Sequence, residues 1–266
     1  MNKINGEVPM LTKFKKSDLV EYLKILEQHI DIDLQTAYDL TLKTIKYYQG
    51  DAKYRFALRR GQDIENNWYE SLERGEPDYS LYDDDYFAVE IWACWVVYSR
   101  KYLNQINKAM DLKGINSIID MGCGIGYTTA TLKQMCPNAK VLGTNIEGTT
   151  QYKVASHIGE KYGFNLIPKV NQQADMIFAS EYFEHIEEPI QHIEDVVKIC
   201  SPKFLVIANA FGAKSMGHFN FYKVGDKRIE NKKIGRVFNA KLRDLGYKQL
   251  KLGFWNNRPQ VWKKYE

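Results

Sequence analysis

The segment Ile118-Ile119-Asp120-Met121-Gly122-Cys123-Gly124-Ile125-Gly126 decides the fold of this 266-residue chain. It joins a short apolar run to an acidic residue and then to three glycines at alternate positions. A helical pattern begins at once, over residues 127–135. Strand, glycine turn and helix in this order let the backbone approach a nucleotide-like ligand, because glycine has no Cβ atom to keep that ligand away.

The spacing of the glycines favours one class of ligand. The dinucleotide fingerprint is G-x-G-x-x-G, which brings a pyrophosphate to the helix N-terminus. Here the spacing is G-x-G-x-G, and the Asp120 carboxylate suits a ligand with cationic groups better than a pyrophosphate. The motif resembles motif I of the class I, seven-strand S-adenosylmethionine-dependent methyltransferases. That resemblance implies that Asp120 holds the amino end of the cofactor. The glycines expected to approach it are Gly122, Gly124 and Gly126.

Regular alternation of strands and helices from residue 113 onward predicts an α/β fold with a doubly wound, mostly parallel sheet. An ending in two strands resembles the methyltransferase sheet, with seven strands and a C-terminal antiparallel hairpin. Residues 113–266 form this predicted domain, and residues 1–112 form a helical extension that acts as a lid or a partner surface. The expected strands are 116–121, 139–144, 164–167, 176–180, 204–209, 248–255 and 260–264.

The end of the second predicted strand should contact the ribose of the cofactor. The resemblance implies an acidic residue there, but this chain has Asn145, with Glu147 two residues later. Either Glu147 accepts the ribose hydroxyls, or Asn145 does so as a weaker, neutral acceptor. Ser180, which ends the fourth predicted strand, completes the predicted cofactor-binding set.

The segment Glu181-Tyr182-Phe183-Glu184-His185 follows the fourth strand, where ligands of open α/β sheets bind. A helical turn beginning at Glu181 would bring two carboxylates and one imidazole to one face, a set that suits Mg²⁺ or Mn²⁺. The pattern resembles the metal site of metal-assisted O-methyltransferases, in some of which a further histidine follows strand five. The predicted metal ligands are Glu181, Glu184, His185 and His218.

The same segment has a metal-free interpretation. Many metal-free relatives have a similar segment in which the histidine is merely packed or hydrogen-bonded. In that case the candidate catalytic bases are His185, Glu184 and His218. No Asn/Asp-Pro-Pro-Tyr/Phe segment and no Pro-Cys nucleophile follows strand four, which leaves in-line methyl transfer to an oxygen or nitrogen.

Charge is unevenly distributed along the chain, whose net charge is +4. Residues 201–266 carry 15 Lys and Arg against 4 Asp and Glu, and basic and aromatic residues alternate over 211–243. This pattern predicts an anionic acceptor, with nucleic acid slightly ahead of a phosphorylated or aromatic small molecule. The alternatives are a solvated lysine-rich surface and a catalytically silent, methyltransferase-like scaffold subunit.

The cysteines and the hydropathy pattern indicate in which cellular compartment the protein is expected. The four cysteines are scattered and no pair has C-x-x-C spacing, which predicts reduced thiols in the cytoplasm. No apolar run approaches the roughly 20 residues that span a bilayer, so no membrane association is expected. The sequence therefore predicts a cytoplasmic S-adenosylmethionine-dependent methyltransferase, with a possible Mg²⁺ or Mn²⁺ ion and a possible protein partner for the extension.

Overall fold

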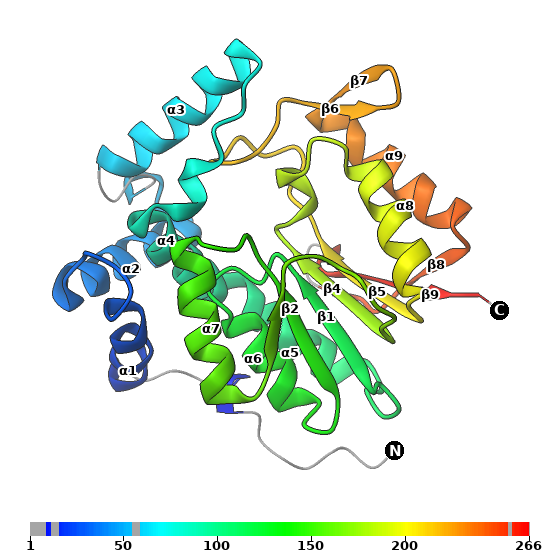
Figure 1. Cartoon of the computed structure of the whole chain (residues 1–266), viewed down its shortest axis with the longest axis horizontal. Helices are drawn as coiled ribbons and strands as arrows, with labels where there is room; N and C mark the ends of the chain where they lie inside the picture. Colours follow the sequence, from blue (N-terminus) through cyan, green and yellow to red (C-terminus); the bar gives the residue numbers. More distant parts are fainter. Residues whose placement is uncertain (1–8, 12–15, 55–58, 255–256, 266) are drawn as a thin grey trace.

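The computed structural model describes residues 9–11, 16–54, 59–254 and 257–265. A seven-stranded sheet runs through the molecule in the order β3-β2-β1-β4-β5-β9-β8 (Figure 1). The first five strands pair in parallel, and β9 pairs antiparallel with both β5 and β8. The strands are β1 (Ser117–Met121), β2 (Lys140–Thr144), β3 (Asn165–Ile167), β4 (Met176–Ser180), β5 (Phe204–Ala208), β8 (Tyr247–Leu250) and β9 (Gln260–Lys264).

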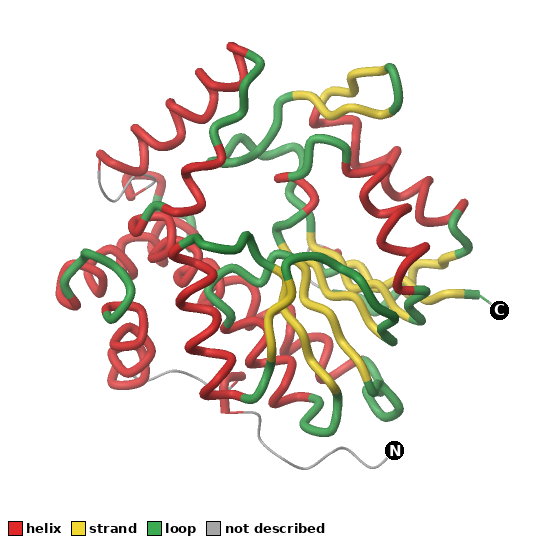
Figure 2. Tube along the Cα trace, viewed as in Figure 1, coloured by secondary structure: helices red, strands yellow, loops and turns green. Residues whose placement is uncertain are grey.

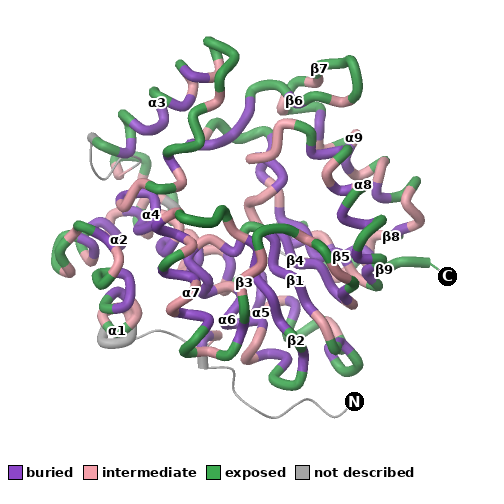
Figure 3. Tube along the Cα trace, in the orientation of Figure 1, coloured by how far each residue is buried: buried purple, intermediate pink, exposed green. Residues whose placement is uncertain are grey.

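The central strands are apolar on both faces because helices cover both faces of the sheet. Ile118, Ile119 and Ile177 are fully buried, as the purple strands of Figure 3 illustrate. Helices α5, α6 and α7 pack in a row along one face, and α8 packs with α9 on the other. Their bounds are α5 (Arg100–Ala109), α6 (Tyr127–Met135), α7 (Thr150–Tyr162), α8 (Pro189–Cys200) and α9 (Asn231–Asp244).

The N-terminal extension is helical, as predicted, and gathers beside the carboxyl ends of the strands (Figures 1 and 2). Asp33 is the N-cap of α2, since its side chain accepts a hydrogen bond from the Thr36 N–H. The helices are α1 (Lys16–Glu27), α2 (Leu34–Tyr48), α3 (Arg59–Arg74) and α4 (Asp85–Cys94), with a 3₁₀ turn η3 (Tyr79–Asp83) before α4.

A π-helical turn, η4 (Trp95–Ser99), joins α4 to α5. The sequence predicts one apolar helix over 87–103, and the structure extends it to residues 85–109 with this turn inside. The side chains of α1 to α5 share one continuous apolar core with the sheet. The extension therefore packs against the helices of the α/β domain, with α1 and α4 on α7 and α5 on α6.

Residues 221–230 differ from the prediction of a long polar connection. They form a β-hairpin of β6 (Phe221–Val224) and β7 (Lys227–Glu230) that pairs separately from the main sheet. The two-residue turn Gly225-Asp226, with a positive φ of 56° at the glycine, closes it. Such turns favour glycine, because hairpin turns need positive φ angles.

In the part of the chain that the structure describes, no helix is long and apolar enough to cross a membrane.

Candidate active site

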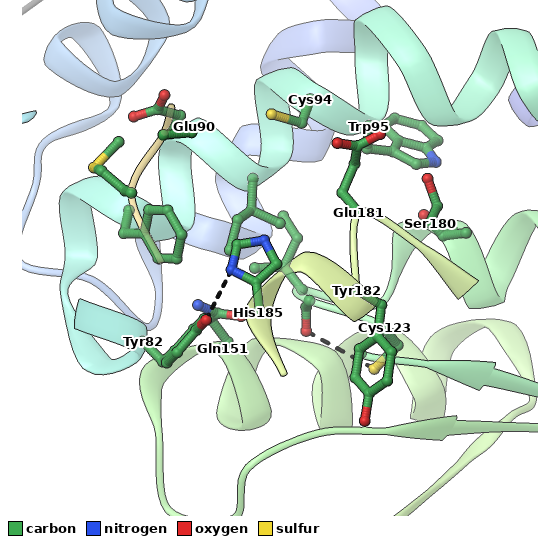
Figure 4. A pocket seen from close by; sticks show the side chains of 18 of the residues that line it. Tyr82, Glu90, Cys94, Trp95, Cys123, Gln151, Ser180, Glu181, Tyr182 and His185 are labelled. Carbon is green, nitrogen blue, oxygen red and sulfur yellow. Dashed lines mark hydrogen bonds between the residues drawn. The ribbon is translucent and has the colours of Figure 1, made fainter. Parts of the chain in front are cut away.

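A cavity of about 760 Å³ opens where the strands of the main sheet end, below the N-terminal extension (Figure 4). Its floor comes from the loops after β1, β2 and β4, and its roof from η3, α4 and η4. Parallel sheets bind ligands at this edge, since the loops of neighbouring strands meet there. Of the predicted site residues, those that line the cavity are Gly122, Gly124, Asn145, Glu147, Ser180, Glu181, His185 and His218.

The glycine turn is shaped by close approaches that a side chain would block. Gly122 and Gly124 have positive φ angles of 64° and 55°. A Cβ atom on Gly124 would lie 2.7 Å from Cγ2 of Ile91 in α4, and one on Gly122 would collide with the ring of Tyr182. The turn therefore packs directly against the extension on one side and the loop after β4 on the other.

Asp120 lies below the turn and does not line the cavity. Its side chain is buried and accepts a 2.7 Å hydrogen bond from Oγ1 of Thr129 in α6. Burial raises the pKa of Asp120 to about 7, against the opposing effect of the Thr129 hydrogen bond. Gly126 also lies outside the cavity lining and caps the N-terminus of α6. The structure thus separates these two residues from the rest of the predicted cofactor set.

Asn145 and Glu147 have different surroundings at the end of β2. The Asn145 amide donates a 2.6 Å hydrogen bond to the Gly124 carbonyl, and its oxygen accepts one from the Ile146 N–H. Glu147 is exposed to the cavity mouth. Asn145 therefore braces the glycine turn, and Glu147 remains available to a ligand.

Some buried polar atoms of the cavity lining have no hydrogen-bond partner within the described chain. Among them are Oγ of Ser180 and Nε2 of Gln151, a residue of α7 that the sequence interpretation did not include. A buried polar group without a partner is costly, so such atoms mark places where a ligand can supply the missing bond. No sequence motif around Gln151 indicates that it lines a binding site.

Glu184 sits behind the cavity wall, fully buried. Its Oε1 atom accepts a 2.6 Å hydrogen bond from the Ala210 N–H, and its carbonyl accepts one from the Tyr222 hydroxyl. Burial and then the Glu181 charge raise the pKa of Glu184 well above its usual range. Burial also raises the pKa of Glu181, but there the positive charge of Arg258 opposes the change. The two carboxyl groups therefore form a buried acidic pair, in which the Glu181 charge disfavours ionisation of Glu184.

His185 and His218 meet edge to face, with ring centroids 4.7 Å apart. Nδ1 of His185 lies 2.9 Å from the Tyr82 hydroxyl, and Nδ1 of His218 lies 3.0 Å from the Ala213 carbonyl. Burial lowers the pKa of both imidazoles, to about 4 for His218, and proximity to His218 lowers that of His185 further. Both rings are thus neutral near pH 7.

The predicted four-residue metal site is not formed. Among the described residues, no three His, Cys, Asp or Glu side chains gather as a metal-binding set. The physical reason is local backbone geometry: Glu181 has a left-handed φ of 51°, and only Phe183–His185 form a single 3₁₀ turn. The expected helical i, i+3, i+4 face is therefore absent, and Glu184 is turned toward Ala210. These residues do not fit a divalent cation.

Aromatic side chains of the extension line the roof of the cavity. Trp92 and Trp95 are both buried in the apolar core, and Trp95 also belongs to the cavity lining, as does Tyr98. The lining includes Tyr79, Tyr82, Phe87, Trp95 and Tyr98. Among the lysines and arginines of residues 211–243, Lys214 alone is in the lining. The others belong to the β6–β7 hairpin and α9, where Lys223 pairs with Glu187 and Lys241 with Glu194.

Comparisons with known proteins agree with this geometry. Residues 119–207 match the family described as "Methyltransferase domain". A malonyl-[acyl-carrier protein] O-methyltransferase of Hahella chejuensis is 23% identical over 138 residues, which cover 49% of this chain and 50% of that protein. The chain thus spans about half the length of this curated relative.

Two solved structures illustrate the likeness of the fold. Human N-acetylserotonin methyltransferase, solved in complex with S-adenosylmethionine, gives a TM-score of 0.50 at 13% identity, covering 84% of this chain and 70% of that one. An O-methyltransferase family protein of Burkholderia thailandensis gives 0.52 at 12% identity, covering 84% and 72%. With the strand order and the glycine turn, the match over residues 119–207 identifies this segment as a methyltransferase domain, and the solved methyltransferases share its fold.

Proposed function

We propose that this chain transfers the methyl group of S-adenosylmethionine to an oxygen or nitrogen of a small molecule held inside the cavity. The observation that carries the proposal is the roof of the cavity, where aromatic side chains of the extension face the glycine turn. A cavity of about 760 Å³ has the volume of a small-molecule site. Oxygen is the preferred acceptor atom, in line with the O-methyltransferase name of the Hahella chejuensis relative.

The charge of the cavity argues against a phosphorylated acceptor. Four carboxylates belong to its lining, against one lysine and one arginine; they are Glu65, Glu90, Glu147 and Glu181, with Lys214 and Arg258. An excess of negative charge repels anions and tolerates neutral or cationic groups. Apart from Lys214, the basic residues that suggested nucleic acid are on α9 and the hairpin, so they do not line the cavity. A neutral or cationic small molecule is therefore the better acceptor.

The residues present suit the cofactor. S-adenosylmethionine, when bound, supplies an electrophilic methyl group on a positively charged sulfur. Gly122 and Gly124 give it a backbone surface, Glu147 can accept bonds from its ribose, and the Ser180 hydroxyl gains a partner. Asn145 acts indirectly, by holding the Gly124 carbonyl.

We assign the proton transfer to His218. In the neutral ring, the Nδ1–H bond to the Ala213 carbonyl leaves Nε2 as the unprotonated nitrogen. Bound S-adenosylmethionine would supply the methyl group, and Nε2 of His218 would take the proton that the acceptor oxygen loses. His185 packs against this ring, and Glu184 holds the loop at Ala210. A divalent cation has no part in this proposal, because the side chains do not fit one.

Methyl-deuterated S-adenosylmethionine tests the proposal. The protein is incubated with the cofactor and either a small-metabolite extract or total nucleic acid, and the label is followed by mass spectrometry. We expect label in the small-molecule fraction. Label in nucleic acid alone, with binding that weakens steeply as salt rises, would establish the rival acceptor. Cofactor binding without any transfer would indicate the silent scaffold.

A further inference from the structure

We infer that Glu181 and Arg258 together bind the amino-acid end of S-adenosylmethionine, with Glu181 on its ammonium group and Arg258 on its carboxylate. This inference rests on the proposed cofactor and assigns the subsite that Asp120 was expected to provide. Neither residue has that role in the sequence interpretation, where Glu181 was a metal ligand and Arg258 had no role.

The two side chains bring opposite charges to one cavity. Glu181 follows β4 and Arg258 precedes β9, and both belong to the lining. They attract one another, yet among the described residues no ion pair joins them. The Glu181 carboxyl is hydrogen-bonded to Glu184, and the Arg258 guanidinium is hydrogen-bonded to the Tyr102 side chain. Two opposite charges that stand apart in one lining match a ligand that carries both charges on one carbon atom.

Their position agrees with the expected path of the cofactor. Strands β1 and β4 are neighbours, with Met121 opposite Ala179. The next residues, Gly122 and Ser180, therefore lie side by side at the edge of the sheet, and Glu181 comes directly after. In Figure 4, Ser180 and Glu181 lie on the opposite side of the view from Tyr82 and Glu90. The amino-acid end and the acceptor thus have separate ends of the cavity.

Backbone contacts hold the two segments that carry these residues. The Glu181 N–H donates a 2.7 Å hydrogen bond to the Ala208 carbonyl, and its φ of 51° is in the left-handed region. A residue other than glycine in that region is strained, and such strain is typical of functional positions. The Arg258 carbonyl accepts a 3.1 Å hydrogen bond from Nε2 of Gln105 in α5. The backbone of both residues is therefore anchored at the edge of the cavity.

A second observation points to a ligand at this position. The Ser180 hydroxyl, next to Glu181, is buried beside the cavity and has no partner within the described chain. It can donate to a carboxylate that Arg258 binds. Asp120 cannot replace Glu181, because its carboxyl is buried below the turn and bonded by Thr129.

Calorimetry with two ligands separates this subsite from the rest of the cofactor site. S-adenosylhomocysteine carries the amino-acid end, and 5′-methylthioadenosine lacks it. Arg258→Met and Glu181→Gln should each weaken S-adenosylhomocysteine about 10- to 100-fold, the loss of one charge-assisted hydrogen bond, and leave 5′-methylthioadenosine unchanged. Decarboxylated S-adenosylmethionine should be insensitive to Arg258→Met but remain sensitive to Glu181→Gln.

Lys214→Met is the matched control, because it removes the other cation of the lining and should alter neither affinity. Equal weakening of both nucleosides by Arg258→Met, or no weakening of S-adenosylhomocysteine, would overturn the inference. Failure of the wild-type protein to bind either nucleoside would instead overturn the proposed cofactor. Thermal unfolding of each variant distinguishes a lost contact from a lost fold.

Discussion

The hydroxyl of Tyr82 lies 2.9 Å from Nδ1 of His185, which joins the N-terminal extension to the loop after β4 (Figure 4). Tyr82 comes from η3 and His185 from a 3₁₀ turn 103 residues later. The extension therefore contributes directly to the neighbourhood of the proposed catalytic histidine.

Tyr82→Phe should lower the free energy of unfolding by about 1 kcal/mol, because it leaves a buried imidazole nitrogen without its partner. Chemical denaturation measures this. Tyr79→Phe is the control: its ring stacks on Tyr82 at 6.4 Å and is 47% exposed. Equal losses in the two variants would mean that the hydrogen bond contributes nothing specific.

His218→Gln should reduce kcat for methyl transfer by roughly 10²–10⁴-fold, the usual contribution of a positioned general base. The affinity for S-adenosylhomocysteine, measured by calorimetry, should stay unchanged. His157→Gln, which alters a histidine on α7 that contacts His29, should retain full kcat. Wild-type turnover in His218→Gln would remove this residue from the mechanism.

Glu147→Ala should weaken cofactor binding by about 1.5–3 kcal/mol, because it removes a charged acceptor for the ribose hydroxyls. Its stability should not change, since Glu147 is exposed. Asn145→Ala should instead lower both affinity and stability, because the Asn145 amide holds the Gly124 carbonyl. An affinity loss confined to Asn145→Ala would assign the ribose to that residue.

Asp120 should make stability depend on pH. Its pKa of about 7 in the folded protein lies above the unfolded value near 4, so the folded state binds more protons between these limits. The free energy of unfolding should therefore fall as pH rises from about 4 to about 7, by at most about 1.4 kcal/mol per pH unit. Denaturation of Asp120→Asn across this range should lack this contribution.

Thr129→Val provides the matched comparison for Asp120. It removes the hydrogen bond that opposes the raised pKa, so the dependence on pH should extend to higher pH than in the wild type. Identical pH profiles in wild type and Asp120→Asn would show that this carboxyl does not titrate there.

Methyl transfer should be unchanged by a chelator, because among the described residues no three His, Cys, Asp or Glu side chains gather as a metal-binding set. Activity is measured after dialysis against the chelator and again after addition of Mg²⁺ or Mn²⁺. Loss and metal-specific recovery of activity would restore the four-ligand hypothesis.

The sheet could be predicted from sequence because its signals are local. The apolar run before Gly122 correctly predicted β1, and the observed bounds of α6, β4 and β9 agree with the predicted ones. The β6–β7 hairpin was missed, although Phe221–Val224, Gly225-Asp226 and Lys227–Glu230 carry the pattern of a hairpin. The bounds of helix α3 were not predicted either.

The site was predicted less completely, since long-range packing decides it. The sequence could not reveal that Arg258, 77 positions after Glu181 in the chain, shares a cavity with it. It also suggested a helical turn at Glu181 that the left-handed backbone prevents. The charge of Asp120 suited the amino end of the cofactor. The packing of α6 on β1, which the sequence does not show, turns its carboxyl toward Thr129 instead.

The π-helical turn Trp95–Ser99 determines how two helices are rotated about a shared axis. Each residue of an α-helix advances about 100°, so one deletion within 95–99 would rotate α4 by that angle relative to α5. The side chain of Ile91 would then lose its close contact with Gly124, and the aromatic side chains of α4 would no longer face the cavity. Helix α5 would remain packed on α6. The π-helical turn thus sets the rotation of α4 relative to α5. One continuous helix can therefore pack on α6 with its second half and line the cavity with its first half.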